Sequence, residues 1–191
     1  MKLINVINNY SGEGNAPRFY LKADTALLRN NDAFYIPEGM GRVTASPSIV
    51  LRVSRLAKCI GERFALRCID AVMGGVCFTA AERLEALRGE GLPWDEAVGF
   101  DHSSALSLEA LDSEAMSQEA YLYINGEERA KFSLGEMRFT AERMVSSLSE
   151  AMTLRIGDLI YLNAPVEVEV KAGDNYRLVI GDRVVLNFDI K

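Results

Sequence analysis

Two glutamates, Glu167 and Glu169, alternate with valines over residues 166–170. Alternate side chains of a β-strand point to the same face, so a strand here would present both carboxylates together. Clustered carboxylate oxygens suit a hard divalent cation. The same alternation is also typical of the solvated face of a half-buried strand. We favour the solvated face and keep Glu167 and Glu169 as an alternative metal pair.

The chain has one histidine, His102, which follows Asp101 and precedes two serines. A Ser-His-Asp triad needs its members to converge from separate segments, and adjacent residues rarely have that geometry. We therefore expect His102 to be a loop or surface residue. The sequence also contains no glycine-rich phosphate loop, no His-x-x-x-His pattern and no paired-cysteine knuckle.

Three cysteines, Cys59, Cys68 and Cys77, are separated by eight residues in each gap. This spacing matches no zinc-binding template. All three have apolar neighbours in the sequence, which predicts buried free thiols in a reducing compartment.

The overall composition is that of a globular protein. The 191 residues are 49% apolar and 25% charged, which suits one domain over residues 1–191 that folds without a disulfide or metal. The net charge of −6 and the dispersed lysines and arginines argue against nucleic acid as a partner. No apolar run reaches membrane-spanning length, and the apolar start is too short for a signal peptide, so we expect a cytoplasmic protein with no membrane partner.

Strand signals dominate the chain. Short apolar or β-branched runs bounded by turn residues predict strands at 2–7, 19–22, 33–36, 49–53, 72–79, 121–124, 129–132, 159–162, 166–170, 176–180 and 184–190. Asn125-Gly126 predicts a tight hairpin, and Gly74-Gly75 predicts a closely approached strand. Helical patterns cover 62–69, 80–88 and 140–152, the last capped by Thr140. The fold class predicted is α+β, mostly β.

Three segments carry a resemblance to a known family. They are Phe19-Tyr-Leu-Lys22, then Pro93-Trp94 with Gly99-Phe100-Asp101, and then Thr153-Leu154 with Gly157-Asp158 and Gly173-Asp174. In order and spacing they resemble the fumarylacetoacetate hydrolase family of 2-oxo-acid C–C hydrolases, isomerases and decarboxylases. The resemblance implies a mixed β-sheet roll or barrel with a few short helices. It also implies an N-terminal region, residues 1–40, of strands and a lid, and a homodimer.

The resemblance also implies a metal site whose ligands are replaced here. The family holds Mg²⁺, Mn²⁺ or Ca²⁺ with a Glu-x-Glu pair and an aspartate, at positions that match Ser46, Ser48 and Cys77. The family lysine before Gly-Phe-Asp corresponds to Val98. Two hydroxyls and a thiol supply no charge for a hard cation, so we expect no metal cofactor.

The pocket loop and the lid that the resemblance implies also differ in this chain. The family's Gly-Thr-Pro loop corresponds to Asn163-Ala164-Pro165, and the lid offers Glu13 without the histidine that hydrolytic members pair with a glutamate. We expect one shared pocket that takes a small carboxylic acid more by apolar contact than by charge. Its predicted lining residues are Ser46, Ser48, Cys77, Val98, Asp101, Asn163 and Ala164.

Two functions remain open from the sequence. We favour a non-catalytic family member that acts as a binding or assembly protein. The alternative is a hydrolase, isomerase or decarboxylase of small, acylpyruvate-like 2-oxo acids with a rearranged site. That site would use Cys77 as a nucleophile or acid, or Glu167 and Glu169 as new metal ligands.

Overall fold

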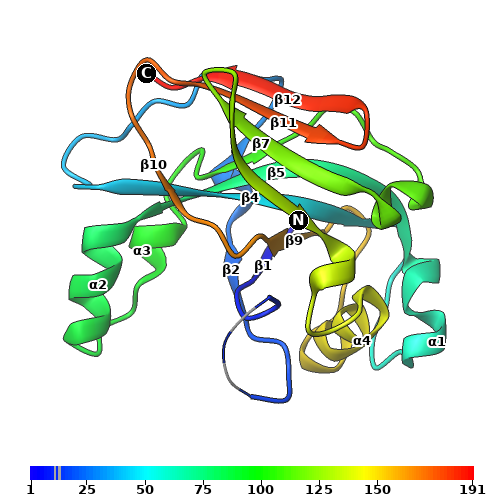
Figure 1. The fold of residues 1–191 in the computed structure, drawn as a ribbon. Helices are drawn as coiled ribbons and strands as arrows, with labels where there is room; N and C mark the ends of the chain where they lie inside the picture. Colours follow the sequence, from blue (N-terminus) through cyan, green and yellow to red (C-terminus); the bar gives the residue numbers. More distant parts are fainter. Residues whose placement is uncertain (11, 13) are drawn as a thin grey trace.

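One large, curled sheet forms the centre of the molecule (Figure 1). The computed structural model describes residues 1–10, 12 and 14–191, and among these eight strands make up this sheet. In spatial order they are β2 (Phe19–Lys22), β1 (Leu3–Val6), β9 (Leu159–Asn163), β4 (Val43–Val53), β5 (Ile69–Ala80), β6 (Ser104–Leu106) and β3 (Leu27–Leu28), with β10 (Val168–Glu169) paired to β4. Most neighbours are antiparallel, whereas β1 pairs with β9 and β3 with β6 in parallel.

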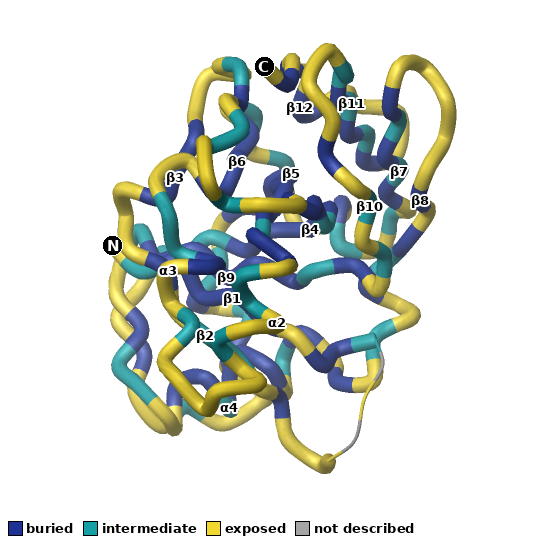
Figure 2. Tube along the Cα trace, turned by 90° about the vertical axis from the view of Figure 1, so that its left-hand side faces the viewer, coloured by how far each residue is buried: buried dark blue, intermediate teal, exposed yellow. Residues whose placement is uncertain are grey.

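A second, antiparallel sheet packs against β5. Within the described residues it has four strands, in the order β12 (Arg183–Asp189), β11 (Asn175–Ile180), β7 (Glu119–Ile124) and β8 (Glu127–Ser133). The predicted hairpin joins β7 to β8, and Asn125 and Gly126 have φ angles of 53° and 84°. These positive angles are those a type I′ turn requires, so the prediction is confirmed. Figure 2 shows buried residues concentrated along the central strands β4, β5 and β9.

Gly74 and Gly75 in β5 allow close packing on both faces of this strand. A Cβ on Gly75 would lie 2.6 Å from the Tyr161 ring, and one on Gly74 would overlap Val185 of the second sheet. The closely approached strand predicted from these glycines is therefore confirmed.

Short helices complete the fold: α1 (Glu62–Ala65), α2 (Ala81–Gly89), α3 (Asp95–Val98) and α4 (Ala141–Ala151). Thr140 caps α4 as predicted, because its hydroxyl accepts a hydrogen bond from the Arg143 N–H at 3.3 Å. The predicted helix 62–69 is shorter, since Leu66–Cys68 form a 3-10 turn and Ile69 already begins β5. None of the helices in the described ranges is long and apolar enough to span a membrane.

Two predicted strands were wrong or too long. Residues 33–36 form no strand, and Phe34 makes only an isolated bridge to Ile190. The apolar side chain of Phe34 instead stacks on Phe78 in the core, with ring centroids 3.7 Å apart. In the run 166–170 only Val168–Glu169 form a strand, because the chain bulges away from β4 between Asn163 and Val168.

The cysteine prediction was right for two of the three residues. Cys68 and Cys77 are buried free thiols, whereas Cys59 is exposed. Cys59 has a φ of 50° and donates its N–H to the Ser149 carbonyl at 2.9 Å. It therefore occupies a tight surface turn, where neighbouring apolar residues do not cover it.

Candidate functional site

The centre of the site is a row of side chains across three strands. In the antiparallel register Ser46 of β4 lies opposite Cys77 of β5, and Ser48 of β4 lies opposite Asn163 of β9. Alternate residues of a strand share a face, so Ser46 and Ser48 both belong to the face on which the site forms. Segments far apart in the sequence thereby meet on one sheet.

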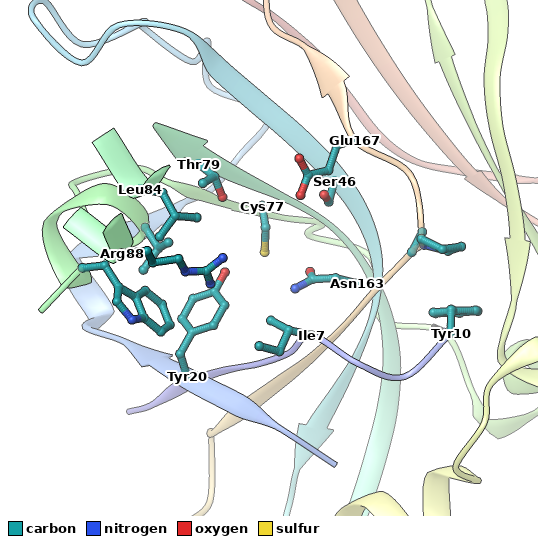
Figure 3. A pocket seen from close by; sticks show the side chains of 14 residues that line it. Ile7, Tyr10, Tyr20, Ser46, Cys77, Thr79, Leu84, Arg88, Asn163 and Glu167 are labelled. Atoms are coloured by element: carbon teal, nitrogen blue, oxygen red, sulfur yellow. The ribbon is translucent and has the colours of Figure 1, made fainter. Parts of the chain in front are cut away.

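Glu167 joins this row because the chain bulges away from β4 after β9 and then pairs with the same edge of β4 again. Asn163 lies opposite Ser48 and Val168 lies opposite Ala45, so the five residue steps from 163 to 168 match only three steps along the same edge of β4, and the two extra residues form a bulge. The Ala164 N–H donates to the Pro47 carbonyl at 2.8 Å and holds the start of the bulged segment on β4. Figure 3 shows the resulting position of the Glu167 carboxylate beside Ser46.

A cavity of about 280 Å³ opens on this row. Five of the seven residues predicted to line one pocket do line it: Ser46, Cys77, Val98, Asn163 and Ala164. Ser48 is fully buried and contacts Asn163 from behind the wall. Asp101 does not line the cavity, because it lies exposed in the turn that follows Phe100. His102, next to it, is an exposed loop residue, as the sequence predicted.

Arg88 is the lining residue that the sequence analysis missed most clearly. It lies four residues after Leu84 on α2, so both side chains occupy the same helix face, and both line the cavity. The Arg88 guanidinium lies over the Trp94 ring, 5.0 Å from its centroid. In Figure 3 it points into the cavity beside the Tyr20 hydroxyl. Only the Leu84–Arg88 spacing gave a sequence signal for this position.

Tyr20 supplies a neutral hydrogen-bond donor. Its ring packs edge-on against Trp94 at 5.4 Å between centroids. Burial raises the pKa of the Tyr20 hydroxyl well above its usual value, and Cys77 and Glu167 raise it further while Arg88 opposes them. The hydroxyl therefore stays protonated at neutral pH and donates toward the cavity.

Asn163 supplies a second donor, with an orientation fixed by Ser48. The Ser48 hydroxyl donates to the Asn163 amide oxygen Oδ1 at 2.5 Å. The amide nitrogen Nδ2 therefore faces away from Ser48, and Figure 3 shows it directed into the cavity toward Tyr20.

Behind the cavity wall a buried lysine lies near Cys77. The Lys22 ammonium donates to the Ser103 carbonyl at 2.7 Å, the Ser103 hydroxyl at 3.2 Å and the Phe78 carbonyl at 3.3 Å. Burial lowers the pKa of Lys22 to about 8, although Cys77 opposes this shift. All three N–H bonds are thus directed at protein oxygens.

Cys77 itself is a neutral thiol. Its Sγ donates to the Asn5 amide oxygen at 2.9 Å, and burial raises the thiol pKa while nearby Lys22 acts in the opposite direction. Because the thiolate is the nucleophilic form, this environment disfavours Cys77 as a nucleophile.

Comparison with known proteins decides the family. A family model described as the C-terminal part of fumarylacetoacetate (FAA) hydrolase matches residues 5–190. The chain belongs to the fumarylacetoacetate hydrolase family. Among its relatives is oxaloacetate tautomerase FAHD1, mitochondrial, of Arabidopsis thaliana, 27% identical over 100% of this chain and 91% of the relative. Oxaloacetate tautomerase YcgM of Escherichia coli (strain K12) is 22% identical over 91% of this chain and 78% of the relative.

Solved structures of the family share the fold. A family protein from Yersinia pestis CO92 superimposes with a TM-score of 0.92 at 24% identity, covering 100% of this chain and 93% of the other. The fumarylpyruvate hydrolase of Pseudomonas aeruginosa, solved in complex with Mn²⁺ and pyruvate, superimposes with a TM-score of 0.88 at 18% identity. This match covers 100% of this chain and 90% of the other. The predicted mostly-β family roll with a few short helices is therefore confirmed.

The residues present in this family member do not fit a hard divalent cation. Ser46, Ser48 and Cys77 offer neutral hydroxyl and thiol groups where the cation needs anionic or carbonyl oxygens. Glu167 lines the cavity, but Glu169 lines a different one, with Lys171 and Asp174. Nowhere in the described part of the chain do three histidine, cysteine or acidic residues cluster in a way that would hold a metal. The predicted lid residue Glu13 lies outside the described residues.

Proposed function

We propose that this chain catalyses proton transfer on a small 2-oxo acid, of the keto–enol kind, without a divalent metal. One observation carries the proposal: a single cavity presents the Arg88 guanidinium, the Glu167 carboxylate and two neutral donors, Tyr20 and Asn163. The family relatives named oxaloacetate tautomerases support it, because one of them aligns with the whole chain. These similarities favour an enzyme over a protein that only binds.

Arg88 would hold the substrate's carboxylate. A guanidinium presents parallel N–H donors that match the two oxygens of a carboxylate. Trp94 lies under the guanidinium plane and limits the directions in which it can point. The anchored acid then has its 2-oxo group close to the Tyr20 hydroxyl, which lies beside Arg88.

Glu167 would act as the general base. It removes a proton from C3, and the C–H electron pair forms the C2–C3 double bond while the C=O π pair moves onto the oxygen at C2. Tyr20 and the Asn163 amide nitrogen donate hydrogen bonds to that developing negative charge. The enolate oxygen then takes a proton from water. Glu167 is exposed on one side, so its proton exchanges with solvent.

Neutral hydrogen-bond donors are better suited to enolisation than to the C–C cleavage reactions of the family. Enolisation breaks a C–H bond and no C–C bond, so no carbon leaving group has to be stabilised. Fixed hydrogen-bond donors aimed at an oxyanion commonly contribute several kcal/mol, on the order of what one metal contact provides. Leu84, Trp94 and Val98 form apolar walls that strengthen these hydrogen bonds by excluding water.

Exchange of the C3 protons for deuterium tests the proposal. Chelator-treated protein in D₂O should accelerate loss of the methylene signal of 4-methyl-2-oxopentanoate, observed by proton NMR. Glu167→Gln should lower the rate at least about a hundredfold, because general-base catalysis contributes about that much. Arg88→Gln should mainly raise the concentration of acid needed for half-maximal rate.

Matched control variants come from the same elements. Arg83 is on the same helix as Arg88, and its guanidinium contacts the Glu96 carboxylate at 3.7 Å, so Arg83→Gln removes a cation from outside the cavity. Glu169→Gln removes the neighbouring glutamate of β10. Both variants should catalyse exchange of the C3 protons at the wild-type rate. Equal loss of rate in Glu169→Gln and Glu167→Gln would contradict the role of Glu167.

A second candidate is a non-catalytic protein that binds the same acids. It is favoured by the neutral thiol of Cys77 and by Ser46, which leave the cavity without the family's metal-binding side chains. This candidate predicts saturable binding that depends on Arg88, with no acceleration of C3 exchange.

A further inference from the structure

We infer that the acid taken by this cavity carries one carboxylate and an apolar substituent, and that Glu167 excludes acids with a second carboxylate. The inference rests on the proposed function and narrows its substrate class. It separates this chain from relatives whose names specify oxaloacetate, which is a dicarboxylic acid.

The charges that line the cavity are the first observation. Within residues 1–10, 12 and 14–191, Arg88 is the single cation of the lining and Glu167 the single anion. Lys22 gives no second anchor, since it lies behind the wall and its ammonium donates to Ser103 and Phe78. Val98 contributes a buried apolar side chain. One carboxylate is therefore matched by one cation.

The placement of these two charges is the second observation. Arg88 comes from α2 on one side of the cavity, and Glu167 comes from the bulged segment between β9 and β10 on another (Figure 3). An acid whose C3 faces the Glu167 carboxylate would place a carboxylate bonded to C3 next to that same group. Two like charges at such short range, with no cation between them, repel each other.

The apolar lining is the third observation. Ile7, Leu84, Trp94, Val98, Ala164 and Pro165 contribute to the cavity surface. An alkyl substituent buries apolar area against these walls, and this burial favours binding. A carboxylate at the same place would lose its hydration without gaining a partner. Shape and charge thus favour the same kind of acid.

Two acids of nearly equal shape test the inference. In 4-methyl-2-oxopentanoate an isopropyl group is bonded to C3, and in oxaloacetate a carboxylate is bonded to C3. Both substituents have two heavy atoms attached to one carbon, so they differ mainly in charge. Trp94 is the only tryptophan of the chain, and it lines the cavity under Arg88. Its fluorescence therefore reports binding, after correction for quenching of free tryptophan by each acid.

The expected result is a preference that depends on Glu167. Wild-type protein should bind 4-methyl-2-oxopentanoate at least about tenfold more tightly than oxaloacetate, which is about 1.4 kcal/mol. Glu167→Gln should reduce this ratio to about threefold or less, chiefly by improving the affinity for oxaloacetate. The control Glu169→Gln should keep the wild-type ratio, because Glu169 lines another cavity.

The possible failures are distinguishable. If both acids bind and oxaloacetate binds equally well or better, the inference is wrong while the proposed function stands. The inference is also wrong if Glu167→Gln leaves the ratio unchanged. If neither acid binds, the proposed function fails and the inference fails with it.

Discussion

Ser48 and Asn163 lie opposite each other on β4 and β9, and the Ser48 hydroxyl donates to the Asn163 amide oxygen at 2.5 Å. The hydrogen bond fixes which end of the amide faces the cavity. Ser48 stands where the family resemblance implies a metal-ligating glutamate, and here it orients a neutral donor. We regard Ser48 as a positioning residue for the oxygen at C2.

Ser48→Ala should weaken this orientation. The Asn163 amide would then be free to turn its oxygen toward the ligand, so we expect the C3 exchange rate to fall several-fold. The free energy of unfolding should fall by only about 1 kcal/mol. Ser48→Thr, which keeps the hydroxyl, should restore the exchange rate. If Ser48→Ala changes stability but not exchange, Ser48 is merely structural.

Rebuilding the family's ligands should create a metal site. Ser46→Glu, Ser48→Glu and Cys77→Asp supply three carboxylates on one sheet face, and Val98→Lys adds a lysine from α3. Titration calorimetry should detect Mg²⁺ binding to this variant and none to the wild type. The control variant, Ser46→Gln, Ser48→Gln, Cys77→Asn and Val98→Lys, should not bind Mg²⁺. Stoichiometric Mg²⁺, Mn²⁺ or Ca²⁺ on native protein would contradict the account.

Lys22 should make stability rise with pH. Its pKa is about 8 in the folded chain and 10.5 without burial, so between these values the unfolded chain binds the extra proton. The cost of burying the ammonium is complete below pH 8 and disappears as pH rises toward 10.5. The stability of the wild type relative to Lys22→Met should therefore increase by about 3 kcal/mol over this range.

Denaturant unfolding of both proteins at several pH values measures this difference. Buried tyrosines such as Tyr161 oppose the trend above about their usual pKa values, but they are present in both proteins and cancel in the comparison. Because Lys22 and Cys77 shift each other's pKa, both proteins also carry Cys77→Ala. A flat difference between pH 8 and 10 would show that the Lys22 pKa is not lowered.

Gly75→Ala should destabilise the fold. The added Cβ would meet the Tyr161 ring at 2.6 Å and Val50 at 2.7 Å, both within the buried core. Overpacking of this kind commonly costs about 1–3 kcal/mol. Gly89→Ala, at a helical position with open space around it, should be neutral or slightly stabilising. Thermal unfolding of the two variants checks the contrast.

Local patterns predicted the elements whose structure is decided locally. The Asn125-Gly126 turn requires positive φ angles that these two residues tolerate, and the apolar stripe of α4 follows helical spacing. Phe34 was predicted as part of a strand because its segment is apolar, yet tertiary stacking on Phe78 decides its position. Periodicity does not contain that long-range contact.

The site was only partly predictable for the same reason. Ser46, Cys77 and Val98 were found because the family resemblance aligns their positions; sheet register brings Ser46 and Cys77 together, and α3 adds Val98. Arg88 was missed because a helical arginine is usually a solvated surface residue. The role of Glu167 was missed because its pairing with Glu169 assumed a regular strand, whereas the chain bulges away from β4 before β10 begins.

The central claim is that this cavity enolises a 2-oxo acid without a metal, with Glu167 as base. The most direct measurement is the rate of C3 deuterium exchange in 4-methyl-2-oxopentanoate, compared for chelator-treated protein and the same protein with added Mg²⁺. We predict equal, saturable rates in both conditions, lost in Glu167→Gln and kept in Glu169→Gln. Exchange that appears only with Mg²⁺, or that never exceeds the rate without protein, would contradict the account.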